Sequence, residues 1–320
     1  MALTNYTVVV NGLSKTISSG NNAVEAVKNV SLKIAKSSIH GFLGPNGAGK
    51  TTTMRMLTTL MKPTNGNGTI CGYDLKNNPS EIRKKIGYVS QVGGCERFET
   101  GRDNLLFQAK IYGLKHNDAI ARIDELIDKF ELNSFCDRKV ESYSGGQRRR
   151  VDIALGLIHN PQVLFLDEPT LGLDIHSRSF LWDEIKACKL SGMTILFSTH
   201  NLEEADSICD NLTIIDKGVV VAEGTPSELK KQIANESIII DFENSQVDLA
   251  YDLLRKLSFV KGIHKTDNTV RIEVPSGLND LPNIIELCKS KSLNICSLRI
   301  SQITLDEVFL KITGRSLRDK

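Results

Sequence analysis

The sequence lacks any apolar run long enough to cross a membrane as a helix. A spanning helix needs about 18 or more consecutive apolar residues, and no stretch of the 320 residues approaches that length. The N-terminus also lacks a basic segment followed by an apolar one, so no secretory signal peptide is expected. Any action at a membrane is therefore expected to go through a partner protein.

The cysteines lack the spacing of a metal site or a disulfide framework. There are seven of them, an odd number, and no pair has C-x-x-C spacing. We expect them to be small buried hydrophobic residues in a reducing compartment.

A strong charge of either sign is also absent. The net charge is +2, which is too small to indicate nucleic-acid binding, and no nucleic-acid partner is expected. Apolar residues make up 40% of the chain and charged residues 24%, as in ordinary globular proteins. The length predicts about two domains.

The most informative segment is Gly44–Thr52, which has the pattern G-x-x-x-x-G-K-T of a P-loop. It follows a strand-like run at 39–43 and precedes a helix-like run at 51–59, which is the context that the motif requires. Glycines let backbone N–H groups turn toward a phosphate, and the helix dipole favours the same anion. We expect Lys50 to reach the β- and γ-phosphates of a nucleotide and the Thr51 hydroxyl to bind Mg²⁺. The predicted nucleotide-binding residues here are Gly44, Pro45, Asn46, Gly47, Ala48, Gly49, Lys50, Thr51 and Thr52.

Two carboxylates follow a second buried strand. The apolar run 163–166 places Asp167 at its carboxyl end, where ligands gather in open α/β sheets. We expect Asp167 to hold Mg²⁺ together with Thr51, through water. Glu168 points elsewhere, toward an attacking water, and is the expected general base.

A second anion-binding element is predicted at the start of a helix. Ser144, Gly145 and Gly146 offer a hydroxyl, free N–H groups and a helix dipole. A chain that already has a P-loop needs this element only for another nucleotide. The structural alternative is a simple helix cap.

The segment Tyr143–Gln147 resembles the LSGGQ motif of ABC-type ATPases, with Tyr in the first place. The order of P-loop, Gln91, this motif, Asp167-Glu168, Leu173-Asp174 and His200 resembles a complete ABC cassette over about residues 4–223. The resemblance implies an α/β fold with a RecA-like core, an antiparallel β subdomain and a helical subdomain. Strand-like alternation over 5–35 and helix-type spacing over 102–131 agree with the last two parts.

The resemblance also implies how the site works. Two cassettes, identical or homologous, would pack head to tail and enclose ATP between the P-loop of one and Ser144, Gly145, Gly146 and Gln147 of the other. His200 would contact the γ-phosphate and Glu168, and Gln91 would contact Mg²⁺ or water. Asp174 would cross the dimer interface.

One position departs from the family pattern. Many cassettes stack adenine on an aromatic residue in a G-L-x-K-x-[YF] context, and here Ile17 occupies that place in Gly12–Ile17. An aliphatic side chain covers a base with less area and without π-stacking. We expect weaker ATP binding or looser base selectivity.

Three consecutive cations, Arg148 to Arg150, follow the motif at the start of its helix. They oppose the helix dipole unless they bind something. A solvated helix face with ion pairs is favoured over contact with a nucleotide or an acidic partner.

The C-terminal part predicts a second domain. Residues 224–236 form a polar connector, and 237–320 a small α+β domain with the order β-α-β-β-α-β. The stretch Ser301–Arg315 resembles the ending of drug-resistance-type, daunorubicin-resistance-like, ABC exporter ATPases. Its amphipathic segment at 304–312 is expected to pack on its own domain or across a homodimer.

The predicted function is therefore ATP hydrolysis that powers export through a separate membrane permease, which docks near residues 91–112. The chain is expected in the cytoplasm, on the inner face of the membrane. Two alternatives stay open: a non-transport ABC ATPase acting on ribosomes or nucleic acid, and a regulatory module that holds ATP without hydrolysing it. The sequence does not identify the transported substrate.

Overall fold

The computed structural model of the chain describes residues 5–19, 22–233, 236–301 and 304–314. Two compact units divide at Pro226 and Ser227, and each is described by itself. Parts of four predicted segments lie outside the described residues: residues 4 and 20–21 of the first domain, 234–235 of the connector, 302–303 and 315 of the exporter-like ending, and 302–303 and 315–320 of the second domain.

The core of the first unit is a six-stranded sheet with the order β10-β9-β3-β8-β7-β6. Its neighbours are parallel except for the β9–β10 hairpin. Strands β3, β7 and β8 are buried at every position, which explains their continuous apolar runs. The strands are β3 (Ile39–Leu43), β6 (Ile86–Val89), β7 (Val163–Asp167), β8 (Thr194–Thr199), β9 (Asn211–Asp216) and β10 (Val219–Gly224).

A second, antiparallel sheet of the first unit has the order β2-β1-β4-β5. It contains the predicted N-terminal strands as one long hairpin. The strands are β1 (Tyr6–Ser19), β2 (Asn22–Ala35), β4 (Asn65–Ile70) and β5 (Tyr73–Asp74).

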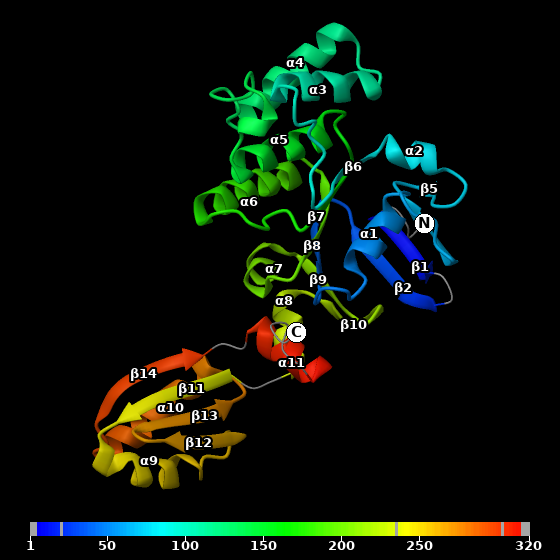
Figure 1. The fold of residues 1–320 in the computed structure, drawn as a ribbon. Helices are drawn as coiled ribbons and strands as arrows, with labels where there is room; N and C mark the ends of the chain where they lie inside the picture. The colour runs from blue at the N-terminus through cyan, green and yellow to red at the C-terminus, as the bar shows by residue number, and fades with distance from the viewer. Residues whose placement is uncertain (1–4, 20–21, 234–235, 302–303, 315–320) are drawn as a thin grey trace. The chain divides into compact units, whose positions relative to one another are not determined.

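The predicted helix-type spacing over 102–131 corresponds to two helices of the first unit. The chain turns between them at Gly113, which has a φ of +74°. These helices, α3 and α4, lie side by side and form much of the helical part (Figure 1). The helices are α1 (Lys50–Leu57), α2 (Pro79–Arg83), α3 (Gly101–Ile111), α4 (His116–Lys129), α5 (Gly145–Leu157), α6 (Ile175–Leu190) and α7 (Leu202–Ile208), with a 3₁₀ turn at Val140–Ser142.

The second unit has the predicted β-α-β-β-α-β order. Its antiparallel sheet, β12-β13-β11-β14, packs its buried face against α9 and α10. The elements are β11 (Glu236–Phe242), α9 (Val247–Leu254), β12 (Gly262–Thr266), β13 (Thr269–Val274), α10 (Gly277–Ser290) and β14 (Ile295–Ser301), with α8 (Pro226–Ile233) before them, a 3₁₀ turn at Asn244–Gln246 and α11 (Leu305–Thr313) after them.

Helix α11 begins with a capping box between Thr304 and Glu307 and ends at Gly314. Its Leu305, Val308 and Phe309 are buried, as the amphipathic spacing predicts. In the part of the chain that the structure describes, every helix is too short or too polar to span a bilayer.

Candidate active site

The P-loop joins β3 to α1 at the carboxyl edge of the central sheet. Gly44–Gly49 form the loop, and Thr51 and Thr52 lie in the first turn of α1. Gly49 has a φ of +106°, which favours glycine. A side chain at Gly44 would place its Cβ 2.2 Å from the backbone oxygen of Ile215, so the loop can approach β9 only with glycine there.

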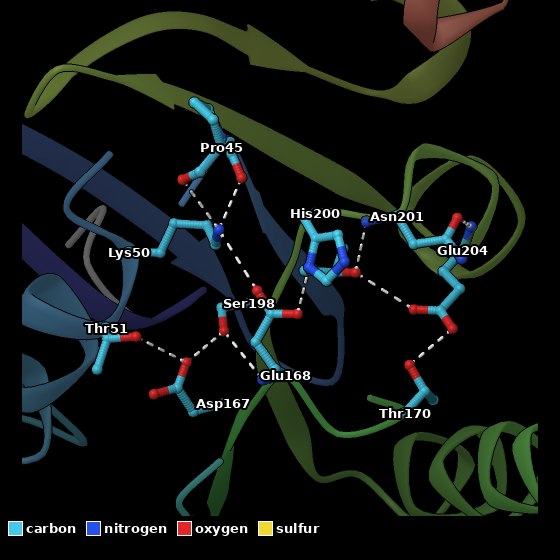
Figure 2. Close-up of polar contacts among 12 residues, drawn as sticks. Pro45, Lys50, Thr51, Asp167, Glu168, Thr170, Ser198, His200, Asn201 and Glu204 are labelled. Atoms are coloured by element: carbon cyan, nitrogen blue, oxygen red, sulfur yellow. Dashed lines mark hydrogen bonds and ion pairs between the residues drawn. The ribbon is translucent and has the colours of Figure 1, made fainter. Parts of the chain in front are cut away.

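Lys50 is buried and turns back over its own loop. Its Nζ donates to the carbonyl oxygens of Gly44 at 2.6 Å and Pro45 at 3.3 Å, and lies 3.4 Å from Oε1 of Glu168 (Figure 2). Burial lowers the pKa of Lys50, while the charges of Glu168 and Asp167 oppose that change.

The two carboxylates at the end of β7 are held separately. Asp167 Oδ1 accepts hydrogen bonds from the hydroxyls of Thr51 at 3.2 Å and Ser198 at 2.5 Å (Figure 2). The backbone N–H of Glu168 donates to Ser198 Oγ at 3.1 Å. Ser198, on β8, therefore fixes both residues, although its sequence context gave no signal for this role.

Glu168 adopts an unusual backbone conformation. Its φ is +49°, in the left-handed region that non-glycine residues rarely occupy. The turn directs its carboxylate away from that of Asp167 and toward Lys50 and His200 (Figure 2). His200 Nδ1 lies 2.7 Å from Glu168 Oε2, and the His200 side chain is 46% exposed, so it can reach a ligand above the sheet.

Gln91 lies in the loop after β6 and is exposed. Within the described residues, no hydrogen bond joins it to Thr51 or Asp167. Its loop is tied instead to α5: Asp152 accepts from the N–H groups of Gly94 at 2.7 Å and Cys95 at 3.1 Å.

The predicted phosphate-binding helix end is the N-terminus of α5. Ser144 is its N-cap, and its hydroxyl and the Gln147 side chain form a capping box. The structural alternative, a helix cap, is therefore present, and Ser144 and Gly145 are nevertheless exposed. A Cβ at Gly146 would lie 2.6 Å from the hydroxyl of Ser177 on α6.

Tyr143 replaces the usual Leu of the motif, and the structure explains how it fits. Its hydroxyl donates to the carbonyl oxygen of Phe135 at 2.9 Å and accepts from Gly101 N–H at 3.1 Å. The tyrosine thus ties the motif to α3. Asp174 caps α6, and the hydrogen bond from the backbone of Ser177 lowers its pKa.

The prediction of a solvated arginine face is wrong for Arg149. Arg149 is buried and donates to the carbonyl oxygens of Ser90 at 2.8 Å, Asp167 at 3.0 Å and Pro169 at 2.8 Å. It therefore joins α5 to the loop of Gln91 and to the end of β7. Arg150 matches only the ion-pair part of the prediction: it pairs with the exposed Glu131 at 2.9 Å, but its side chain is 21% exposed and its guanidinium lies over the ring of Phe180.

Ile17 lies on β1 near the turn of the β1–β2 hairpin and is 40% exposed. Val24, directly opposite on β2, is also exposed. The pair presents an aliphatic surface at the end of the hairpin, and Val24 was not singled out from the sequence.

The fold and the site define an ABC-type ATPase cassette, and comparisons with known proteins agree. A family model described as "ABC transporter" matches residues 27–171, and one described as "ATP-binding protein DrrA1-3-like, C-terminal domain" matches residues 224–313. The daunorubicin/doxorubicin resistance ATP-binding protein DrrA of Streptomyces peucetius is 36% identical over 303 residues, covering 93% of this chain and 91% of that protein. The linearmycin resistance ATP-binding protein LnrL of Bacillus subtilis (strain 168) is 33% identical over 296 residues, 92% of this chain and 95% of that protein.

A solved structure of the ATP-binding cassette MJ0796, described as a dimeric post-hydrolysis state bound to ADP and Pi, aligns with a TM-score of 0.64 at 27% identity. The alignment covers 68% of this chain and 98% of that chain. This chain belongs to the family of ABC transporter ATP-binding subunits, with a DrrA-like C-terminal domain. It binds and hydrolyses ATP, and the predicted fold class is confirmed. The alternative that acts on ribosomes or nucleic acid is not supported.

Proposed function

We propose that two copies of this chain join head to tail, so that each ATP lies between the P-loop of one copy and the Ser144–Gln147 helix end of the other. The observation that carries this proposal is that Ser144 and Gly145 are exposed, while no hydrogen bond among the described residues joins them to the chain's own P-loop. A helix N-terminus with free N–H groups attracts phosphate.

The donor set at the edge of the sheet fits Mg²⁺. Thr51 Oγ1 and Asp167 Oδ1 are hard oxygen donors 3.2 Å apart, and Mg²⁺ is commonly held by one or two protein oxygens plus substrate phosphates. Thr51 and Asp167 would hold the ion, with Gln91 contributing its amide oxygen. When bound, Mg²⁺ supplies neutralising charge to the phosphates.

The chemistry of hydrolysis is assigned to Glu168, His200 and Lys50. Glu168 accepts the proton of the attacking water, and His200 holds that carboxylate while its exposed ring faces the γ-phosphate. Lys50 offers its charge to the phosphates once it leaves the carbonyl oxygens that it now contacts. Glu203, three residues after His200, is exposed. Within the described residues, its side chain makes no hydrogen bond or ion pair with Lys50, Glu168 or His200.

A membrane permease is the proposed partner, and its docking site is the surface around α3. A cavity of about 500 Å³ lies there, lined by Glu96, Glu99, Asp103, Asn104, Leu106, Phe107 and Lys110. Phe107, in its lining, and Phe98, which precedes the lining residue Glu99 in the chain, are 66% and 62% exposed. Exposed apolar patches with polar rims mark interaction sites. The expected ligand of the surface around α3 is a short helix of the permease, with apolar residues for the phenylalanines and basic residues for the acidic groups.

Docking of this kind would place the chain in the cytoplasm on the inner face of the membrane. Relatives named for daunorubicin and linearmycin resistance support export of a drug-like or lipid-like amphiphile as the purpose.

Mixing two inactive variants tests the shared site. Lys50→Ala disables the P-loop and Ser144→Arg the helix end, so each homodimer has two broken sites. A mixed dimer has one intact site, and a 1:1 mixture should recover about a quarter of the wild-type ATPase activity if pairing is random. No recovery would show that each site is completed within a single copy.

Retention on native membranes tests the docking site. The double variant Phe98→Ser/Phe107→Ser should leave the membrane fraction, while Leu190→Ser, which changes an 86% exposed leucine on α6, should stay bound. Release of both variants, or of neither, contradicts the assignment of this surface.

A further inference from the structure

Glu204 is a buried carboxylate that lies between the two loops flanking the Glu168–His200 pair. It is on α7, and its side chain is 6% exposed. Oε1 accepts from the hydroxyl of Thr170 at 2.6 Å, and Oε2 accepts from the hydroxyl of Thr199 at 3.3 Å (Figure 2). The third partner is Arg178, whose Nε lies 3.3 Å from Oε1.

The partners of Glu204 belong to different parts of the site. Thr170 comes two residues after Glu168 and begins the loop that leads to Asp174, the N-cap of α6. Thr199 directly precedes His200, and its hydroxyl also accepts from the N–H of Asn201 at 2.9 Å. One carboxylate therefore bonds both to the segment after Glu168 and to the segment that carries His200.

Because Glu204 is a buried carboxylate, its bonds to Thr170 and Thr199 restrict the movement of the two loops relative to each other. Removing a carboxylate from water is costly unless charge-assisted hydrogen bonds replace its hydration. Thr170 and Thr199 donate such hydrogen bonds, and Arg178 adds its charge at 3.3 Å without a hydrogen bond. The two threonines can reach the carboxylate together only when the two loops keep their present separation. A shift of the 170–174 loop would therefore weaken the hold on Thr199 and, with it, the position of His200.

We propose that Glu204 is a positioning residue that sets His200 against Glu168 and couples that pair to the 170–174 loop. Glu204 touches neither the nucleotide nor the water. It acts by holding Thr170 and Thr199 at fixed places. The inference rests on the proposed roles of His200, Glu168 and the head-to-tail dimer, because the 170–174 loop can then transmit the arrival of the second copy to the hydrolytic pair.

A purely structural ion pair would behave differently from a positioning residue. Loss of a structural pair lowers the melting temperature but leaves the turnover of the folded protein unchanged. Loss of positioning lowers kcat at saturating ATP and leaves the KM for ATP nearly unchanged, since Lys50 and Thr51 are intact. The split between kcat and KM therefore separates the two roles.

The test uses the full chain and measures ATPase kinetics, ATP affinity and melting temperature. Thr170→Val and Thr199→Val each remove one hydroxyl with little change of shape. Thr7→Val is the matched control, because Thr7 is a buried threonine whose hydroxyl bonds Thr194 at 3.0 Å at the other end of β8. We expect kcat to fall about 10-fold in each test variant, as for a loss of about 1.4 kcal/mol in the transition state, and to stay unchanged in the control.

The decisive measurement is the double variant Thr170→Val/Thr199→Val. If both hydroxyls act through Glu204, the double variant should lose little more kcat than the stronger single variant. Glu204→Gln, which keeps an acceptor for Thr170, should retain more kcat than Glu204→Ala. Independent, multiplicative losses in the double variant, or losses of melting temperature with kcat intact, would overturn the proposal.

The outcome is distinguishable from failure of the proposed function. Failure of that function appears as no recovery of activity in the mixture of the Lys50→Ala and Ser144→Arg variants. Failure of the inference appears only in the threonine variants, while that mixture still recovers activity.

Discussion

The carboxylate of Glu168 is shared between two nitrogen groups: Oε2 lies 2.7 Å from His200 Nδ1, and Oε1 lies 3.4 Å from Lys50 Nζ. The two side chains come from different elements, the loop after β8 and the start of α1. The left-handed backbone of Glu168 is what aims its carboxylate at both, while Asp167 faces Thr51 and Ser198. Neighbouring carboxylates therefore have separate partners and can do separate chemistry.

Glu168→Gln should abolish turnover without preventing ATP binding. The amide keeps the size of the side chain but cannot accept a proton, so kcat should fall by about 10²–10⁴-fold, the usual contribution of a general base. ATP should then trap a dimer detectable by light scattering. Glu203→Gln, at an exposed neighbour on α7, is the control. Near-normal turnover in Glu168→Gln would mean that another group takes the proton.

Ile17→Tyr should tighten ATP binding. An aromatic ring at this partly exposed position adds stacking on adenine, which is worth about 0.5–1.5 kcal/mol, or about a two- to tenfold lower Kd. Inorganic triphosphate is the matched control ligand, because it lacks the base and should gain nothing. Equal affinity for ATP in both proteins, measured by calorimetry, would show that adenine is held elsewhere.

Features encoded by contiguous residues were predictable from the sequence. The P-loop, the buried strand before Asp167, and the capping residues of α5 each depend on neighbours within a few positions, so their local patterns predict their structures. The β-α-β-β-α-β order of the second unit followed for the same reason.

Features that depend on distant partners were not predictable. Arg149 sits in a run of three arginines that looks solvated, yet its acceptors are backbone oxygens at Ser90, Asp167 and Pro169. Ser198 is equally inconspicuous, since its bond to Asp167 joins two strands. Only the packing of α5 and β8 brings these groups together.

Arg149→Gln should destabilise the first unit strongly. Three buried carbonyl oxygens lose their charged donor, and the glutamine amide can replace at most part of it, so we expect a loss of about 3–5 kcal/mol. Arg150→Gln provides the comparison within the same helix. Arg150 pairs with an exposed glutamate and lies over the ring of Phe180, so its loss should cost about 1–2 kcal/mol, less than that of Arg149. Urea denaturation at neutral pH measures both, and similar losses for the two variants would contradict the role given to Arg149.

Acidification should destabilise the chain through its buried histidines. Burial lowers the pKa of His40 to about 4, where its ring nitrogen Nε2 and Thr213 Oγ1 lie 2.8 Å apart, and lowers the pKa of His159 to about 4. Above pH 6.5 both rings are neutral whether the chain is folded or unfolded. As the pH falls from 6.5 toward 4, the unfolded chain takes up protons that the folded chain does not bind, so the free energy of unfolding decreases.

Between pH 7.5 and 5.5 the loss should be about 1 kcal/mol for each histidine. His40→Gln keeps a neutral hydrogen-bonding group beside Thr213 but cannot titrate in this range. Urea denaturation of the wild-type chain, His40→Gln and His159→Gln at both pH values should therefore show a smaller pH dependence in each variant than in the wild type. If the dependence is the same in all three proteins, these two histidines are not its source.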